Sequence, residues 1–225
     1  MNSQDSNIAK NSGVGDPLKS LSQIFEIDRP FSGGSIKDTH ASLSEINLHS
    51  HIPSDVRQLF ETAKNVALYS RFAYRLNQVT EMVAFSALDM ATNILCTNDR
   101  LLDKVPIGLV KRLKRIKSTG VFNNDYFGEN LDEATKIGIQ NERIKITKAE
   151  IKKYGSAKSD PYRKITNAEI KNGIKRGVAV DGHINLIAVL RNDLAHGSKC
   201  LMPTCLSTLK QIAALINYLY RDEKL

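Results

Sequence analysis

The chain has 225 residues, enough for one large domain or for one domain with an insertion. Hydrophobic residues make up 41% of it, which supports an ordinary core, and Lys and Arg outnumber Asp and Glu by 32 to 24. The net charge of +8 suits an anionic partner such as RNA, whereas the lack of tryptophan and the 6% of aromatic residues argue against a stacking platform for single strands.

The cysteines and the apolar runs indicate a cytoplasmic protein. Cys96, Cys200 and Cys205 form no paired framework, and the polar N-terminus lacks the apolar core of a secretory signal. No run reaches the roughly 18 consecutive apolar residues of a membrane span, so we expect a soluble protein without a membrane partner. His196, Cys200 and Cys205 match no common zinc spacing, and we expect neither a metal nor a cofactor.

The first fifty residues are expected to form a loosely ordered N-terminal segment, 1–50. Ser, Asn, Asp and Gly dominate its start, and the two glycines within residues 32–35 are typical of a flexible linker. Residues 21–27 carry apolar side chains that can dock on the core as a short strand or a helical turn. Residues 51–225 are then the helical domain.

Two helices are predicted between Pro53 and Pro106, a stretch without internal Gly or Pro. The first begins near Val56, and the second, over residues 76–95, is apolar enough to be a buried central helix. Two carboxylates within the second helix need cationic partners, because burying an unpaired charge is costly. These carboxylates are Glu81 and Asp89, and the candidate partners are Arg71, Arg75 and Arg191.

A third helix is predicted from Pro106 to about Lys117, closed near Gly120. Its inner face carries Leu and Ile, and most of its other positions are cationic, without one acid among them. This surface is either an ordinary solvated face or a stripe that follows a phosphate backbone. The candidate RNA-binding residues on it are Lys111, Arg112, Lys114 and Arg115.

Residues 121–180 interrupt the helical pattern and form a predicted basic insertion. Within it, residues 145–152 and 164–171 repeat a Thr-x-x-Glu sequence, the spacing of a helix capping box, so each copy should begin a short helix that ends at Gly155 or Gly173. From residue 141 to 176, eleven Lys or Arg stand against four Asp or Glu, a net charge of +7. The insertion is therefore an RNA clamp, a mobile surface arm or the docking surface of an acidic partner protein.

Two helices end the chain. The first is mostly apolar from Ile184 to Ala195, with Asp181 as its N-cap and Gly197 as the left-handed residue that ends it. The second, over residues 204–221, has an apolar stripe that we expect to pack on the central helices. This packing should leave the preceding helix partly free for a dimer seam.

The end of the first of these helices carries Arg191, Asn192 and His196. Arginine holds a phosphate in a planar fork and histidine carries a proton near neutral pH, so the two can cleave RNA without metal. Five residues on a regular helix are roughly 140° apart, and a frayed last turn or a second subunit must bring the pair to one phosphate. On a purely structural interpretation, Arg191 is an ion-pair partner of Glu81 or Asp89, and His196 is a helix cap.

The segment Arg191, Asn192, Asp193, Leu194, Ala195, His196 resembles the signature of the HEPN superfamily, an arginine, a polar residue and a histidine shortly after. The resemblance implies an all-α, HEPN-like helical bundle, here with a basic insertion before the motif helix, and a homodimer whose two motifs share one cleft. It implies a metal-independent endoribonuclease that acts as a toxin or antiviral-defence effector, with an antitoxin or regulatory protein as a further partner.

On this interpretation, the ribose 2′-hydroxyl of RNA attacks the neighbouring phosphate. His196 serves as general base or acid, Arg191 neutralises charge on the phosphate oxygens, and Asn192 binds the phosphate or holds the arginine. Two alternatives stay open. One is a non-catalytic HEPN-like module that binds RNA or a partner protein, and the other is a basic helical nucleic-acid-binding protein that contains the string by chance.

Overall fold

The computed structural model describes residues 18–28, 35–98, 106–157, 160–195 and 204–221. In these ranges the chain forms helices and no strand, so the predicted all-α class is confirmed. The helices are, in chain order, α2 (Ile36–Ser44), α3 (Ser54–Tyr69), α4 (Leu76–Asn98), α5 (Leu109–Ser118), the 3-10 helix η2 (Asn124–Asn130), α6 (Leu131–Tyr154), α7 (Asn167–Arg176), α8 (Val178–Ala195) and α9 (Cys205–Leu219).

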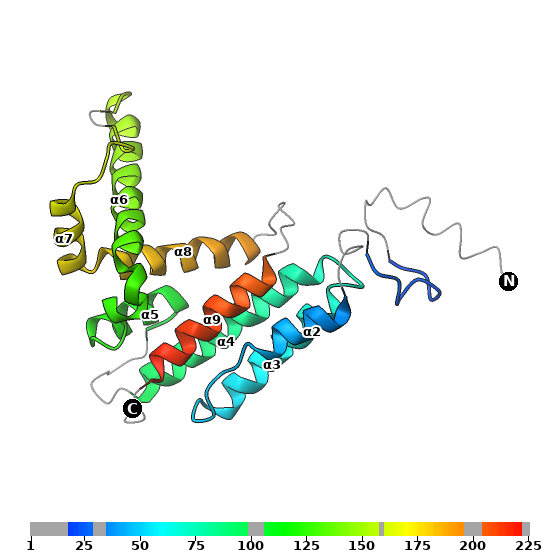
Figure 1. Cartoon of the computed structure of the whole chain (residues 1–225). Coiled ribbons are helices and arrows are strands. Elements are labelled where there is room, and N and C mark those ends of the chain that lie inside the picture. The colour runs from blue at the N-terminus through cyan, green and yellow to red at the C-terminus, as the bar shows by residue number, and fades with distance from the viewer. Residues whose placement is uncertain (1–17, 29–34, 99–105, 158–159, 196–203, 222–225) are drawn as a thin grey trace.

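Four helices, α2, α3, α4 and α9, run side by side as an elongated bundle, in which α4 contacts both α3 and α9 (Figure 1). Its interior is apolar because each helix turns a hydrophobic face toward its neighbours. Phe60 of α3, Leu88 of α4 and Ile216 of α9 are completely buried there. The helix α4 is therefore the central helix that its composition predicts.

One segment of α4, Leu76–Thr97, is long and apolar enough to cross a membrane by length and composition. A count of consecutive apolar residues misses it, because polar residues such as Thr80 interrupt the run. In the structure 44% of this window is buried against other helices, and the core helix of a soluble protein passes the same test. Among the described residues it is the one such helix, and it is weak evidence for a membrane span.

The helices α6 and α7, which we call the arm, project away from the bundle, and α8 joins the arm to it (Figure 1). The helices α6 and α8 approach each other closely where both carry glycine. A Cβ atom added at Gly138 would lie 2.6 Å from the carbonyl oxygen of Val178, and one at Gly182 would lie 3.2 Å from Cα of Gly138. The two glycines therefore allow the close contact that anchors the arm.

The arm differs from the predicted interruption of the helical pattern over residues 121–180. The helix α6 alone is 24 residues long, and Thr147 lies buried inside it instead of at the start of a helix. The capping-box spacing has no effect at Thr147, because the preceding turns already supply partners for the backbone amides. Gly155 does end this helix in the left-handed conformation, with a φ of 75°.

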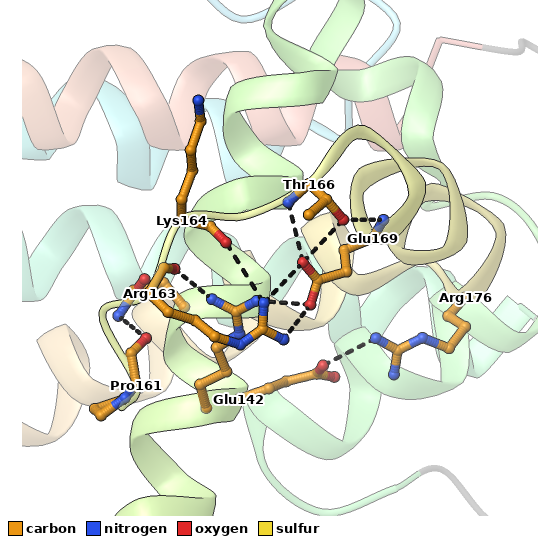
Figure 2. Close-up of polar contacts among 9 residues, drawn as sticks. Glu142, Pro161, Arg163, Lys164, Thr166, Glu169 and Arg176 are labelled. Atoms are coloured by element: carbon orange, nitrogen blue, oxygen red, sulfur yellow. Dashed lines mark hydrogen bonds and ion pairs between the residues drawn. The ribbon is translucent and has the colours of Figure 1, made fainter. Parts of the chain in front are cut away.

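The second copy of the repeat begins a helix as predicted. Thr166 is the N-cap of α7: its hydroxyl accepts a hydrogen bond from the Glu169 amide at 3.3 Å, and the Glu169 carboxylate accepts one from the Thr166 amide at 3.0 Å (Figure 2). The predicted end at Gly173 is wrong, since the helix continues to Arg176 and Gly177 caps it with a φ of 67°. Gly173 is a packing position, because a Cβ there would lie 2.7 Å from Cγ2 of Thr135.

The segment 1–50 contains a helix, α2, that its polar composition does not predict. Ser35 and Asp38 form a capping box at its start, in which the Ser35 amide donates to the Asp38 carboxylate at 3.2 Å. Upstream, Lys19 pairs with Asp28 at 2.6 Å and donates to the Phe72 carbonyl at 2.6 Å. Ser35, which falls in the predicted linker, is therefore a helix cap. Lys19 attaches the start of the segment to the bundle through the Phe72 carbonyl.

Candidate functional site

The helix α8 carries the motif at its C-terminal end. It begins at Val178, directly after the Gly177 that ends α7, so Asp181 lies within its first turn and is not the predicted N-cap. Asp181 pairs instead with Lys117 of α5 at 2.7 Å. The described part of α8 ends at Ala195, and the predicted catalytic His196 lies outside the described residues.

Arg191 stands on the exposed side of the last turns of α8, where Asn192 is exposed as well. Its side chain lines a groove of about 190 Å³ between α8 and α4. Among the described residues, no carboxylate forms an ion pair with this guanidinium. The residues that line the groove are Met82, Phe85, Ser86 and Asp89 of α4 and Arg191, Leu194 and Ala195 of α8.

The acidic residue of this groove, Asp89, is paired with Arg112 of α5 and not with Arg191. Nη2 of Arg112 lies 2.5 Å from Oδ1 of Asp89. The same guanidinium donates to the Thr92 hydroxyl at 3.3 Å and to the Pro106 carbonyl at 3.1 Å. Because Arg112 is only 6% exposed, its charge is held inside the protein and compensates the carboxylate beside Arg191.

Arg112 does not belong to the exposed cationic stripe that the sequence predicts on α5. Lys111 and Lys114 are exposed and Arg115 is half-buried, whereas Arg112 is buried and cannot reach a phosphate backbone from its place between α4 and α5. The sequence holds the signal for this, because Arg112 falls on the helical spacing of the inner face. The buried residues of α5 are Leu109, Arg112, Leu113 and Ile116.

Glu81, the other carboxylate of α4, accepts hydrogen bonds from two hydroxyl groups. The donors are Thr204 at 2.7 Å and Thr208 at 2.8 Å, not the arginine expected from the sequence. These residues line a second groove of about 310 Å³, which shares Phe85 and Leu194 with the first. The last turns of α8 therefore border two adjoining grooves.

The exposed face of α8 next to the motif carries three large apolar side chains beside the exposed Asp193. The exposed fractions of Leu186, Val189 and Leu190 are 46%, 55% and 38%, and that of Met82 on the neighbouring α4 is 47%. A gathering of large apolar side chains on a protein surface is typical of an association surface. Leu186 and Leu190 border α9, because both line a pocket with Thr208 and Gln211, whereas Val189 lines none of the three grooves described between α8 and its neighbours.

His183, at the other end of α8, is surrounded by aromatic rings. Its ring centroid lies 5.2 Å from that of Tyr126, 5.9 Å from Phe127 and 6.1 Å from Phe122. Burial lowers the pKa of His183 to about 4 and raises the pKa of Tyr126 to about 12, so both are neutral at pH 7. Residues 121–128, at the start of the predicted insertion, supply these rings and pack η2 against α8.

Within the described ranges, no group of three or more His, Cys, Asp or Glu side chains is placed to hold a metal ion. Cys96 and Cys205 are buried thiols on α4 and α9. The site is therefore defined by its geometry alone: an exposed arginine, a compensated carboxylate and an apolar surface on one helix end. In comparisons with known proteins, no family model, curated protein or solved structure matches the chain.

Proposed function

We propose that this protein is a metal-independent endoribonuclease in which Arg191 and His196 act on one RNA phosphate. The observation that carries the proposal is the exposed Arg191 beside a groove whose carboxylate, Asp89, is already paired with the buried Arg112. A phosphate that enters this groove meets a guanidinium without meeting an uncompensated acid. Ala195 lines the same groove, and His196 follows it directly in the chain.

The proposed reaction uses the nucleophile that RNA itself carries. A general base removes the proton from the ribose 2′-hydroxyl, the 2′-oxygen bonds to phosphorus, and the bond from phosphorus to the 5′-oxygen breaks. A general acid returns a proton to that 5′-oxygen, so the products are a 2′,3′-cyclic phosphate and a 5′-hydroxyl. His196 takes the proton-transfer roles, Arg191 holds the phosphate oxygens as negative charge grows on them, and Asn192 assists it.

The active form in this proposal is a homodimer built on α8. Arg191 and His196 point roughly 140° apart on a regular helix, so two helices related by a two-fold axis offer each phosphate an arginine and a histidine more readily than one helix does. The exposed Leu186, Val189 and Leu190 supply apolar area for that contact. The resemblance of the motif to the HEPN signature supports a role as a cytoplasmic toxin or antiviral effector, held in check by an antitoxin.

The test is cleavage of single-stranded RNA and transfer RNA by the purified protein in excess chelator. Arg191→Ala and His196→Ala are expected to abolish cleavage, whereas Arg57→Ala and His40→Ala, which alter exposed residues elsewhere, are the matched controls. Circular dichroism of each variant shows whether the fold is retained. Product ends should be a cyclic phosphate and a 5′-hydroxyl, and DNA should stay intact because it lacks the 2′-hydroxyl.

Two results would overturn the nuclease proposal. One is cleavage that persists at the wild-type rate in folded Arg191→Ala and His196→Ala proteins. The other is RNA that stays intact at every protein concentration. RNA binding without cleavage, lost in Arg191→Ala, would instead establish a non-catalytic RNA-binding module.

A further inference from the structure

The arm carries a surface that the proposed nuclease chemistry does not use. Its two helices are joined by a network in which Glu169 accepts hydrogen bonds from Arg143 at 2.6 Å and from Arg163 at 2.6 Å, while Arg176 pairs with Glu142 at 3.1 Å (Figure 2). The two arginines and the Thr166 cap hold the pKa of Glu169 well below its usual range. These contacts support α6 from the side of α7 and leave another side of α6 uncovered.

The uncovered side of α6 has an apolar line at heptad spacing. Ile137, Ile144 and Ile151 are seven residues apart, which is nearly two full turns, so they lie on one line along the helix. Ile137 is 55% exposed and Ile151 is 49% exposed, and Ile144 between them is partly exposed. The intervening positions Asn141 and Lys148 are polar, so this is a single apolar line, narrower than the two-position seam of a coiled coil, and it can pack against one partner helix.

A row of lysines borders this line on one side. Lys145 and Lys152 each follow one of the isoleucines by one position, and Lys148 follows Ile144 by four. Steps of one and of four residues rotate in the same direction around a helix by roughly 100° and 40°, so the three lysines share one flank. All three are exposed.

The isoleucine line and the lysine flank together indicate which kind of molecule binds this face of α6. Three kinds can be compared: a second copy of α6, RNA and a helix of another protein. A second copy of α6 in parallel orientation would bring lysine rows of like charge toward each other, which opposes association. In antiparallel orientation the lysines would face uncharged positions of the same flank, such as Ala134 and Asn141, and would gain no acidic partner. RNA would pair with the lysines but would leave the isoleucines without an apolar partner. A helix with an apolar seam and a flank of Asp or Glu satisfies both features.

We propose that this face of α6 is a docking surface for an acidic amphipathic helix of a partner protein. Burial of the isoleucine line supplies the apolar contact, and the lysine flank selects acidic partners and sets the orientation of the helix. The surface lies on the arm, apart from the groove of Arg191, and the inference does not rest on the nuclease proposal.

The first experiment measures binding of the full-length protein to synthetic helical probes. The probe is a side-chain-stapled peptide of about 21 residues, or three heptads, with Leu along one seam and Glu along its flanks. One control peptide replaces each Glu by Lys, and a second replaces each seam Leu by Ser. Fluorescence anisotropy should show a Kd on the order of 10 μM for the Glu-flanked peptide and at least tenfold weaker binding of both controls.

The second experiment changes the surface. Two variants should each weaken binding of the Glu-flanked peptide at least about tenfold. The isoleucine variant combines Ile137→Ser with Ile151→Ser, and the lysine variant combines Lys145→Glu, Lys148→Glu and Lys152→Glu. Leu186→Ser and Lys111→Glu, which alter an exposed leucine of α8 and an exposed lysine of α5, should leave it unchanged. Circular dichroism confirms that α6 stays folded in each variant.

Several outcomes overturn the inference. Equal binding of the Glu-flanked and Lys-flanked peptides, or no binding up to about 1 mM, removes the acidic helix as the occupant. Sedimentation that shows self-association lost in the isoleucine variant assigns this face to a second copy. RNA affinity lost in the lysine variant, together with peptide binding that is unaffected in both variants, assigns the face to nucleic acid.

Discussion

Arg112 places its guanidinium 2.5 Å from the carboxylate of Asp89, and that same carboxylate lines the groove of Arg191. The pair is asymmetric, since the side chain of Arg112 is 8% exposed and that of Asp89 is 41% exposed. If the pair is broken, water can therefore solvate the Asp89 carboxylate, but it does not reach the Arg112 guanidinium. One ion pair therefore contributes both to the contact between α4 and α5 and to the charge of the candidate site.

Replacing Asp89 by Ala should lower the free energy of unfolding by about 2 kcal/mol, because the buried guanidinium of Arg112 loses its acid. Urea denaturation measures this, with Asp193→Ala as the control, an exposed acid of α8 for which we expect a change below about 0.5 kcal/mol. Adding Arg112→Met to Asp89→Ala should recover part of the loss. Equal effects of the two single acid substitutions would show that the pair does not stabilise the fold.

Local sequence patterns predict the helices of this protein, but they do not predict a residue's role where contacts with a neighbouring segment determine it. Thr147 and Thr166 share the same capping-box spacing, yet only Thr166 caps a helix, because residues before Thr147 are already helical. Arg112 reads as a surface cation among Lys and Arg, but its register with Leu109 and Leu113 turns it inward toward Asp89. The helical spacing of Arg112 indicates the inner face, but the sequence does not identify Asp89 as its partner.

The candidate site shows the same limit. The spacing from Arg191 to His196 can be read directly, whereas the sequence leaves open whether Arg191 is exposed, as the structure has it, or paired with a carboxylate of α4. Which carboxylate stands beside Arg191 cannot be read, because the sequence offers Glu81 and Asp89 equally and the packing of α5 and α9 decides their partners. In the proposed dimer, convergence of the two motifs depends on a second subunit, which the sequence of one chain does not place.

Stability should depend on pH through His183. Its pKa is lowered to about 4 in the folded protein by burial, against about 6.5 in an unfolded chain, so the unfolded state binds the proton more tightly. The stabilisation is present above about pH 6.5 and is lost as the pH falls toward 4, by an amount on the order of 2–3 kcal/mol.

Denaturation at a series of pH values measures this effect. His183→Gln, which cannot titrate, should flatten the dependence between pH 4 and 6.5, whereas the exposed His40→Gln should keep it. An imidazole resonance of His183 that titrates near pH 6.5 would contradict the assignment.

The close contact of α6 and α8 makes Gly138 sensitive to a single methyl group. Alanine is the better helix former by roughly 1 kcal/mol, so Gly138→Ala would stabilise an isolated helix. Here the new Cβ would lie 2.6 Å from a backbone oxygen of Val178, which cannot move aside as a flexible side chain can. We therefore expect a net loss of about 1–3 kcal/mol in urea denaturation. Asn141→Ala, at an exposed position of the same helix, is the control and should be neutral or stabilising. A neutral or stabilising effect of Gly138→Ala would mean that the two helices separate easily.

Association through α8 should be lost when a charge is placed in its exposed apolar face. Val189 is 55% exposed, and a second copy that packs on α8 buries it, so Val189→Glu would desolvate a carboxylate within the contact. Sedimentation velocity should show a dimer for the wild type and a monomer for Val189→Glu, with RNA cleavage lost along with the dimer. Ile137→Glu is the matched control, because Ile137 is also β-branched and also 55% exposed but lies on the arm. A dimer that persists in Val189→Glu and dissociates in Ile137→Glu would move the two-fold contact from α8 to α6.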